Sequence, residues 1–127
     1  MKNLRIILRV LLGLLCLLPI LGGLGIFPAP TADLYTPAGW TFMSALIGSG
    51  YMFPLLAVSF FAALVCIVTN RMALAALILL PLVVNIVLFH AVVDTGLFSA
   101  PASMGVMILL LEAFFLWDNR RAYRTFI

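Results

Sequence analysis

His90, the only histidine of the chain, stands one helical turn before Asp94 near the end of a long apolar segment. Residues four apart lie on the same face of a helix, so the carboxylate can orient the imidazole ring. Such a pair can handle a proton, and at a membrane interface it can donate to the carbonyl of a quinone. A hydrogen bond that merely ends the helix explains the spacing equally well. His90 and Asp94 are therefore candidate catalytic residues with no assigned reaction.

Asn85 lies five residues before His90, in the apolar stretch from Pro81 to His90. At helical spacing the two side chains point about 140° apart, so they face one ligand only if the helix kinks at Pro81 or a second helix intervenes. We treat Asn85 and His90 as candidate ligand-binding residues. The alternative for Asn85 is a hydrogen bond between helices, which is the commoner use of an amide inside a membrane.

Arg9 and Glu112 are charged residues placed inside apolar segments. Glu112 lies about 9 Å from the inner end of its segment, and Arg9 enters from the same side to a similar depth. Pairing would offset an insertion cost of roughly 2.5 to 3.5 kcal/mol for a central charge. We predict an intramembrane ion pair between Arg9 and Glu112, with a packing role favoured over proton transfer. A protonated, neutral Glu112 is the alternative.

The motifs of soluble enzymes are absent from the sequence. One histidine cannot supply H-E-x-x-H, and neither a G-x-S-x-G elbow nor a G-x-x-x-x-G-K-[ST] phosphate loop is present. Cys16 and Cys66 are isolated in apolar segments and are expected to be packing residues without a disulfide. With a single strong ligand, no metal site is expected.

The composition is that of a membrane protein, with 66% hydrophobic and 9% charged residues among 127. A spanning helix needs about 20 apolar residues. Four segments qualify, at 6–25, 51–69, 72–93 and 101–117, and they predict one all-α domain over 1–127, a four-helix transmembrane bundle. Small residues along these segments predict close packing of the helices. A short interfacial helix is expected at Trp40 to Ile47. A cleaved signal peptide is the less favoured interpretation of the first segment.

The basic residues all fall on one side of these four segments. They are Lys2, Arg5, Arg9, Arg71, Arg120, Arg121 and Arg124, whereas the connections on the other side hold the acids Asp33 and Asp94. The positive-inside rule then places both termini in the cytoplasm. The net charge of +3 is explained by anchors that favour anionic lipid head groups, so nucleic-acid binding is not expected.

Three stretches together resemble the DoxX family of small four-span bacterial membrane proteins. They are Gly50-Tyr51-x-Phe53-Pro54-Leu55, Pro81-Leu82-x-x-Asn85-Ile86-x-Leu88-Phe89-His90, and Glu112 to Trp117 before a basic tail. The resemblance implies the bacterial cytoplasmic membrane. Some relatives are subunits of a thiosulfate to quinone oxidoreductase, and others associate with membrane redox complexes. Many relatives carry a carboxylate midway along the second span, where this chain has Ser59-Phe60-Phe61.

Two functions follow as expectations. The first is an auxiliary or structural module that binds lipid or another hydrophobic ligand, or organises a redox complex or a homo-oligomer, without being an independent enzyme. The second is a quinone-linked redox subunit that uses the face of His90 and Asp94. The cofactor is unknown, with quinone as the candidate. Transport is weaker, because four short spans carry one buried acid.

Overall fold

A computed structural model of the protein describes residues 1–94 and 96–125, and this part of the chain contains helices and no strand. The all-α prediction is therefore confirmed for the described residues. The elements in order are α1 (Lys2–Gly23), the 3-10 turn η1 (Ala32–Leu34), α2 (Pro37–Ser49), α3 (Met52–Val68), α4 (Met72–Leu88), the π-helical turn η2 (Phe89–Val93), α5 (Ser103–Asp118) and α6 (Arg120–Tyr123).

The predicted apolar segments all form helices, but not all of these helices are long. α1, and α4 together with η2, each comprise 22 residues, which corresponds to about 33 Å. α3 and α5 have 17 and 16 residues, or about 25 and 24 Å, against a hydrocarbon core of about 30 Å. Two described helices are thus long and apolar enough to cross a membrane, or three if α2 and α3, bent by 83°, count as one span.

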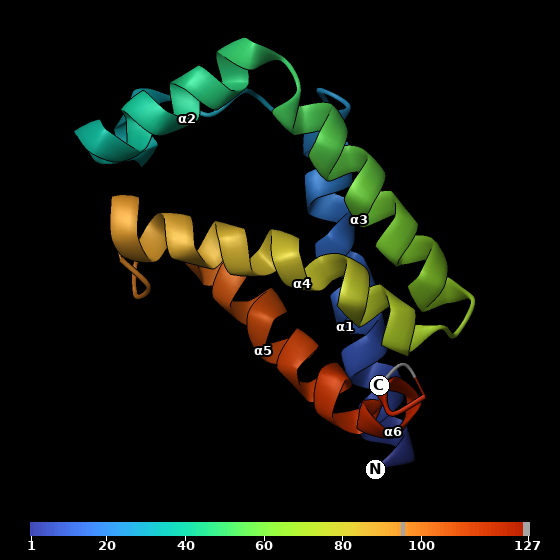
Figure 1. Cartoon of the computed structure of the whole chain (residues 1–127). Helices are drawn as coiled ribbons and strands as arrows, with labels where there is room; N and C mark the ends of the chain where they lie inside the picture. The colour runs from blue at the N-terminus through green and yellow to red at the C-terminus, as the bar shows by residue number, and fades with distance from the viewer. Residues whose placement is uncertain (95, 126–127) are drawn as a thin grey trace.

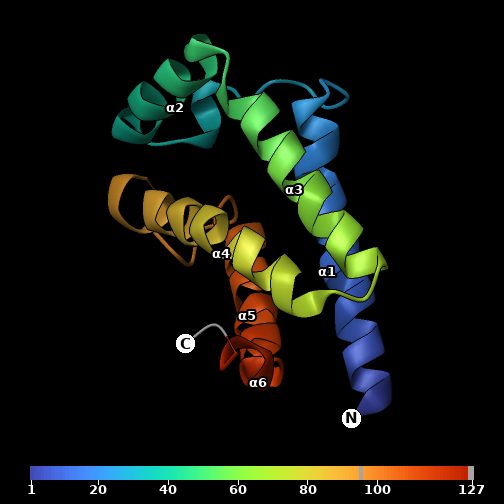
Figure 2. The ribbon, with the colours of Figure 1, turned by 45° about the vertical axis from the view of Figure 1, so that its right-hand side comes forward.

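The helices form two packed pairs that meet at one end of the molecule and diverge toward the other. α1 packs along α3, α4 packs along α5, and α3 contacts α4, whereas α1 and α5 touch only briefly. Figures 1 and 2 show the N-terminus and α6 at the end where the pairs meet, and α2 across the opposite end. This arrangement is more open than the compact bundle predicted from the small residues.

The core lies where the two pairs cross, and its members are almost entirely apolar. Leu12 and Cys16 of α1 are fully buried, as are Phe60 of α3 and Leu79 of α4. Cys16 and Cys66 are both buried and neither forms a disulfide, as predicted. Close packing at small side chains is also found, since Ala63, Ala75 and Ala76 are buried in the core.

Gly23 allows α1 and α3 to approach closely at the divergent end. A Cβ atom at this position would lie 2.7 Å from the Cβ of Ala57 and 2.8 Å from the carbonyl oxygen of Phe53. We expect Gly23→Ala to separate the two helices and to lower the free energy of unfolding by about 1 to 3 kcal/mol, measured by detergent denaturation in micelles. Gly48→Ala is the control, because a Cβ atom there meets nothing within 4 Å. Equal stabilities of the two variants would contradict this packing.

Candidate functional site

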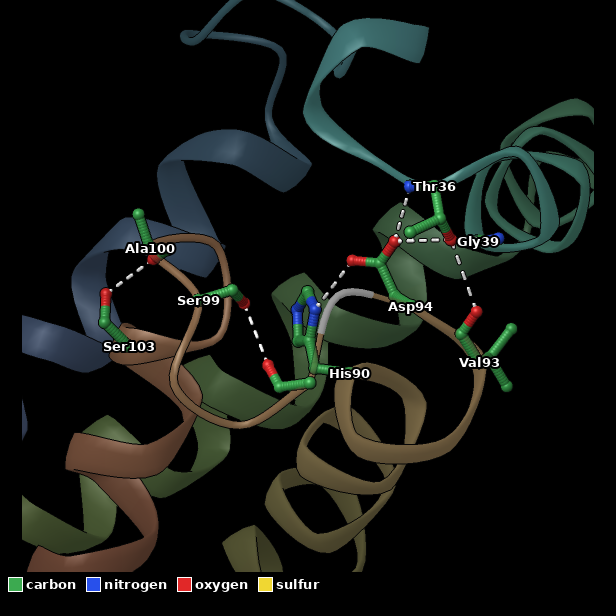
Figure 3. A network of polar contacts seen from close by, with 9 residues as sticks. Thr36, Gly39, His90, Val93, Asp94, Ser99, Ala100 and Ser103 are labelled. Atoms are coloured by element: carbon green, nitrogen blue, oxygen red, sulfur yellow. Dashed lines mark hydrogen bonds and ion pairs between the residues drawn. The ribbon is translucent and has the colours of Figure 1, made fainter.

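His90 and Asp94 lie where α4 widens into η2, and their predicted contact is confirmed. The Nδ1 atom of His90 is 3.1 Å from Oδ2 of Asp94 (Figure 3). The widened turn is closed by the amide of Asp94, which donates to the carbonyl of Phe89 at 3.1 Å. The side chain of His90 is 10% exposed and that of Asp94 is wholly buried. π-helical turns are rare and often occur at functional sites.

Asp94 also receives hydrogen bonds from the start of α2. The backbone amide of Thr36 donates to Oδ1 of Asp94 at 2.8 Å, and the Thr36 hydroxyl lies 3.2 Å from the same oxygen. Thr36 is the N-cap of α2 and accepts from the amide of Gly39. The carboxylate therefore lies at the positive end of the α2 dipole. It connects α2 to the end of α4, in addition to orienting His90.

The fit around this carboxylate is tight. A Cβ atom on Gly39 would lie 2.9 Å from Cγ of Asp94, closer than real Cβ contacts allow. The sequence contains one local sign of this arrangement, since Thr36 before Pro37 is typical of the start of a helix. Nothing in the sequence indicates that the acid near this helix start comes from a residue 58 positions away.

Aromatic side chains pack around the same junction. Phe89 lies edge-on to the His90 ring, with centroids 5.0 Å apart, and stacks on Phe42 of α2 at 5.5 Å. Tyr35 contacts Phe89 at 6.1 Å and stacks on Trp40 at 6.0 Å. Burial, and secondarily the charge of Asp94, raise the pKa of Tyr35 above its usual value. These aromatic contacts hold α2 against η2.

The second ring nitrogen of His90 is the atom available to a ligand. Among the described residues, Nε2 makes no hydrogen bond, and the side chain keeps a small exposed area. With a proton on Nδ1 directed at Asp94, neutral His90 offers Nε2 as an acceptor, and protonated His90 offers it as a donor. Nε2 is therefore the ring atom through which His90 can form a hydrogen bond to a ligand.

Asn85 does not join this site. It lies on the exposed side of α4, whereas His90 is buried. Within the described part of the chain its side chain forms no hydrogen bond to another helix. The structure therefore separates the two candidate ligand-binding residues, as their helical phase predicted.

The predicted ion pair between Arg9 and Glu112 is wrong. Arg9 donates instead to the end of α3, from Nε to the Ile67 carbonyl at 2.8 Å and from Nη2 to the Val68 carbonyl at 3.0 Å. Its Nη1 donates to Oδ1 of Asn70 at 2.8 Å. The last carbonyls of a helix have no amide partner within the helix and carry the negative end of the dipole, so they suit a guanidinium.

Glu112 is fully buried in α5, and neither carboxylate oxygen has a hydrogen-bond partner among the described residues. An ionised carboxylate without a partner is very costly in such surroundings. A protonated carboxylic acid leaves only the smaller cost of an unsatisfied neutral polar group. The structure therefore favours the neutral form of Glu112, which was the alternative at the level of sequence.

Two polar contacts at the end that carries the termini were not predicted. Arg5 of α1 pairs with Asp118 of α5 at 2.7 Å, and the hydroxyl of Tyr123 donates to the carbonyl of Ala73 at 2.9 Å. Both connect residues that are distant in sequence, so no local spacing signals them. They join α1 to α5 and the short α6 to α4.

An apolar cavity of about 380 Å³ lies between the diverging helix pairs. All ten residues around it are apolar, and they come from α1, the segment after it, α3, α4 and α5. They are Leu18, Pro19, Gly22, Gly23, Phe27, Phe53, Leu56, Phe60, Ile86 and Met104. Sequence reasoning missed this cavity, because its lining residues look like ordinary membrane-facing or core positions.

Comparison with known proteins found no match to a family model, a curated protein or a solved structure. Among the described residues, no three His, Cys, Asp or Glu side chains gather as metal ligands would. The candidate site thus consists of the His90 and Asp94 pair, with its link to α2, and the apolar cavity nearer the centre of the molecule.

Proposed function

We propose that this protein is a DoxX-like membrane protein that holds a hydrocarbon chain, from a lipid or another hydrophobic ligand, in the apolar cavity. It acts as an auxiliary module of a membrane-associated complex, not as an independent enzyme. The cavity is the observation that carries this proposal. Its volume of about 380 Å³ falls within the roughly 300 to 1,000 Å³ of ligand pockets.

The lining of the cavity suits an alkyl or isoprenoid chain better than a polar molecule. None of the described residues in the lining has a hydrogen-bonding side chain, so selectivity comes from shape and from dispersion contacts. Gly22 leaves space beside α1 that a larger residue would occupy, since a Cβ atom there meets only a ring carbon of Phe27. A chain entering from the bilayer would lose little solvation, because lipid tails are as apolar as the cavity wall.

The proposal includes four spans with both termini in the cytoplasm. The basic residues lie in the first half of α1, in the turn between α3 and α4, and after α5, and the positive-inside rule would place this side in the cytoplasm. α3 and α5 are short for a span, and local thinning of the bilayer can accommodate short helices. The resemblance to the DoxX family supports the bacterial cytoplasmic membrane as the location.

A second candidate function is a quinone-linked redox subunit. One specific observation favours it: Ile86 lines the cavity and precedes His90 by one turn, and Nε2 of His90 has no partner among the described residues. A quinone would then place its isoprenoid tail in the cavity and a ring carbonyl near His90. In this role a redox partner protein of the complex supplies the electrons, the imidazole donates a proton to the reduced carbonyl oxygen, and Asp94 orients the ring.

The cavity can be tested by filling it. Gly22→Leu is suitable, because a Cβ atom there meets only a ring carbon of Phe27, at 4.0 Å. We expect this variant to reduce labelling by a photoactivatable diazirine fatty acid several-fold in lipid nanodiscs, because leucine occupies the space of the chain. Gly48→Leu introduces the same side chain outside the cavity and should label like the parent protein. Equal labelling of all three proteins would refute a hydrocarbon site here.

The alternative function is tested by measuring quinone binding in a variant of His90. His90→Ala should retain fatty-acid labelling and lose affinity for decylubiquinone, measured by equilibrium dialysis against nanodiscs without protein. Unchanged quinone binding in this variant would exclude a role for His90. Reversed positions of the termini in reporter fusions would contradict the proposed topology.

A further inference from the structure

A second cavity, of about 470 Å³, lies at the opposite end of the molecule from His90. The first turns of α1, the connection between α3 and α4, and the end of α5 surround it. Three basic residues of α1, namely Lys2, Arg5 and Arg9, line one part of the cavity. Ile6, Met72 and Phe115 form an apolar part of the wall. The cavity therefore has the mixed character of a membrane interface.

The basic side chains retain unused hydrogen-bond donors. Arg5 contacts Asp118 through one nitrogen, Nη2, and its side chain is 55% exposed. Arg9 uses Nε, Nη1 and Nη2 once each toward α3 and the residues after it. A guanidinium has five N–H groups and an ammonium has three, so both arginines and Lys2 can donate further.

The charge of this cavity is positive. Lys2, Arg5 and Arg9 contribute three positive charges and Asp118 contributes one negative charge, which leaves a net charge of +2. Asn70 and Asn119 add amide groups to the lining without changing the charge. Converging cationic donors in a partly enclosed space are the arrangement that binds phosphate groups.

We propose that this cavity binds a phosphate group, supplied by the head group of an anionic phospholipid. The apolar wall selects the lipid over free phosphate, because it can contact the first carbons of the acyl chains while the oxygens meet the basic residues. Bound lipid would bridge α1 and α5 beside the contact between Arg5 and Asp118. This site would fix the end of the molecule where the two helix pairs meet.

The site is separate from the apolar cavity, so the two proposals fail independently. Gly22→Leu lies at the other end of α1 and should leave phosphate binding unchanged. The inference rests only on the membrane location that forms part of the proposed function.

The test uses the full chain in neutral detergent, with native mass spectrometry after addition of dioleoylphosphatidylglycerol, dioleoylphosphatidylcholine or inorganic phosphate. We expect preferential retention of phosphatidylglycerol. The double variant K2Q/R5Q should weaken this retention about tenfold, because charge-assisted hydrogen bonds are lost. The matched control is R121Q/R124Q, which removes two exposed charges from the same end but outside the cavity, and it should retain the lipid.

A variant that binds more lipid cannot be explained by misfolding, so it complements the variants that lose binding. Asp118→Asn raises the net charge of the cavity by one and should increase the retention of phosphatidylglycerol. Equal losses in K2Q/R5Q and R121Q/R124Q would show diffuse surface attraction and overturn the proposal. Displacement of the lipid by an equal concentration of inorganic phosphate would overturn the lipid as the source. Equal retention of phosphatidylcholine and phosphatidylglycerol would overturn recognition of charge.

Discussion

Asp94→Ala is expected to destabilise the protein by about 3 to 5 kcal/mol and to release α2 from the end of α4. The wholly buried carboxylate contacts Nδ1 of His90 as well as the amide and hydroxyl of Thr36. Its removal leaves these groups without an acceptor in a poorly solvated junction, and unsatisfied buried donors are costly. It also removes the negative charge at the start of α2.

Hydrogen–deuterium exchange in micelles measures this effect directly. The amides of Thr36 and Gly39 should exchange faster in Asp94→Ala, together with those of η2, whereas amides in the core of α1 should change least. Asp33→Ala is the matched control, since Asp33 is an exposed acid in the segment that precedes α2. Asp94→Asn should be intermediate, because its amide oxygen can still accept from Thr36. Exchange in Asp94→Ala that matches Asp33→Ala would contradict the linking role of Asp94.

Glu112→Leu is expected to stabilise the protein by about 1 to 3 kcal/mol. The side chain of Glu112 is fully buried and its oxygens lack partners among the described residues, so the native protein bears the cost of desolvating an unsatisfied polar group. Leucine has a similar volume and removes that cost. Glu112→Gln keeps a neutral polar group and should leave stability nearly unchanged. Denaturation by sodium dodecyl sulfate, followed by circular dichroism, measures both variants.

A loss of stability in Glu112→Leu would instead support the ion pair between Arg9 and Glu112 that was predicted from their depths. If Arg9 neutralised Glu112, Glu112→Leu would strand a buried cation and lower the stability. A double-mutant cycle with Arg9→Gln separates the two cases. We expect additive effects, with a coupling energy below about 0.5 kcal/mol, because Arg9 contacts the end of α3 instead. A coupling energy well above that value would refute the arrangement described here.

The two ends of the molecule differ in the polar contacts that hold the helices together. At the end with α2, polar atoms concentrate around Asp94, and the aromatic cluster covers His90 on one side. At the other end, Arg9 and Arg5 hold α1 against α3 and α5. The apolar cavity lies between these two connected regions, where the helix pairs diverge.

Local patterns in the sequence determined the positions of the helices and one polar contact. Runs of apolar residues predicted the helices that became α1, α3, α4 with η2, and α5, because hydropathy is a property of consecutive residues. The pairing of His90 with Asp94 followed from their separation by one turn. The apolar stretch from Trp40 to Ile47 likewise indicated a short helix, which is the central part of α2.

Only the tertiary structure decided the contacts between distant segments. The helical rise per residue placed Arg9 and Glu112 at similar depths in the membrane. Depth does not specify the rotation of a helix around its axis or which helix lies beside it. Arg9 therefore contacts the last carbonyls of α3, and Asp94 contacts the start of α2. The cavities arise for the same reason: their shapes depend on the angles between packed helices, which no short stretch of sequence specifies.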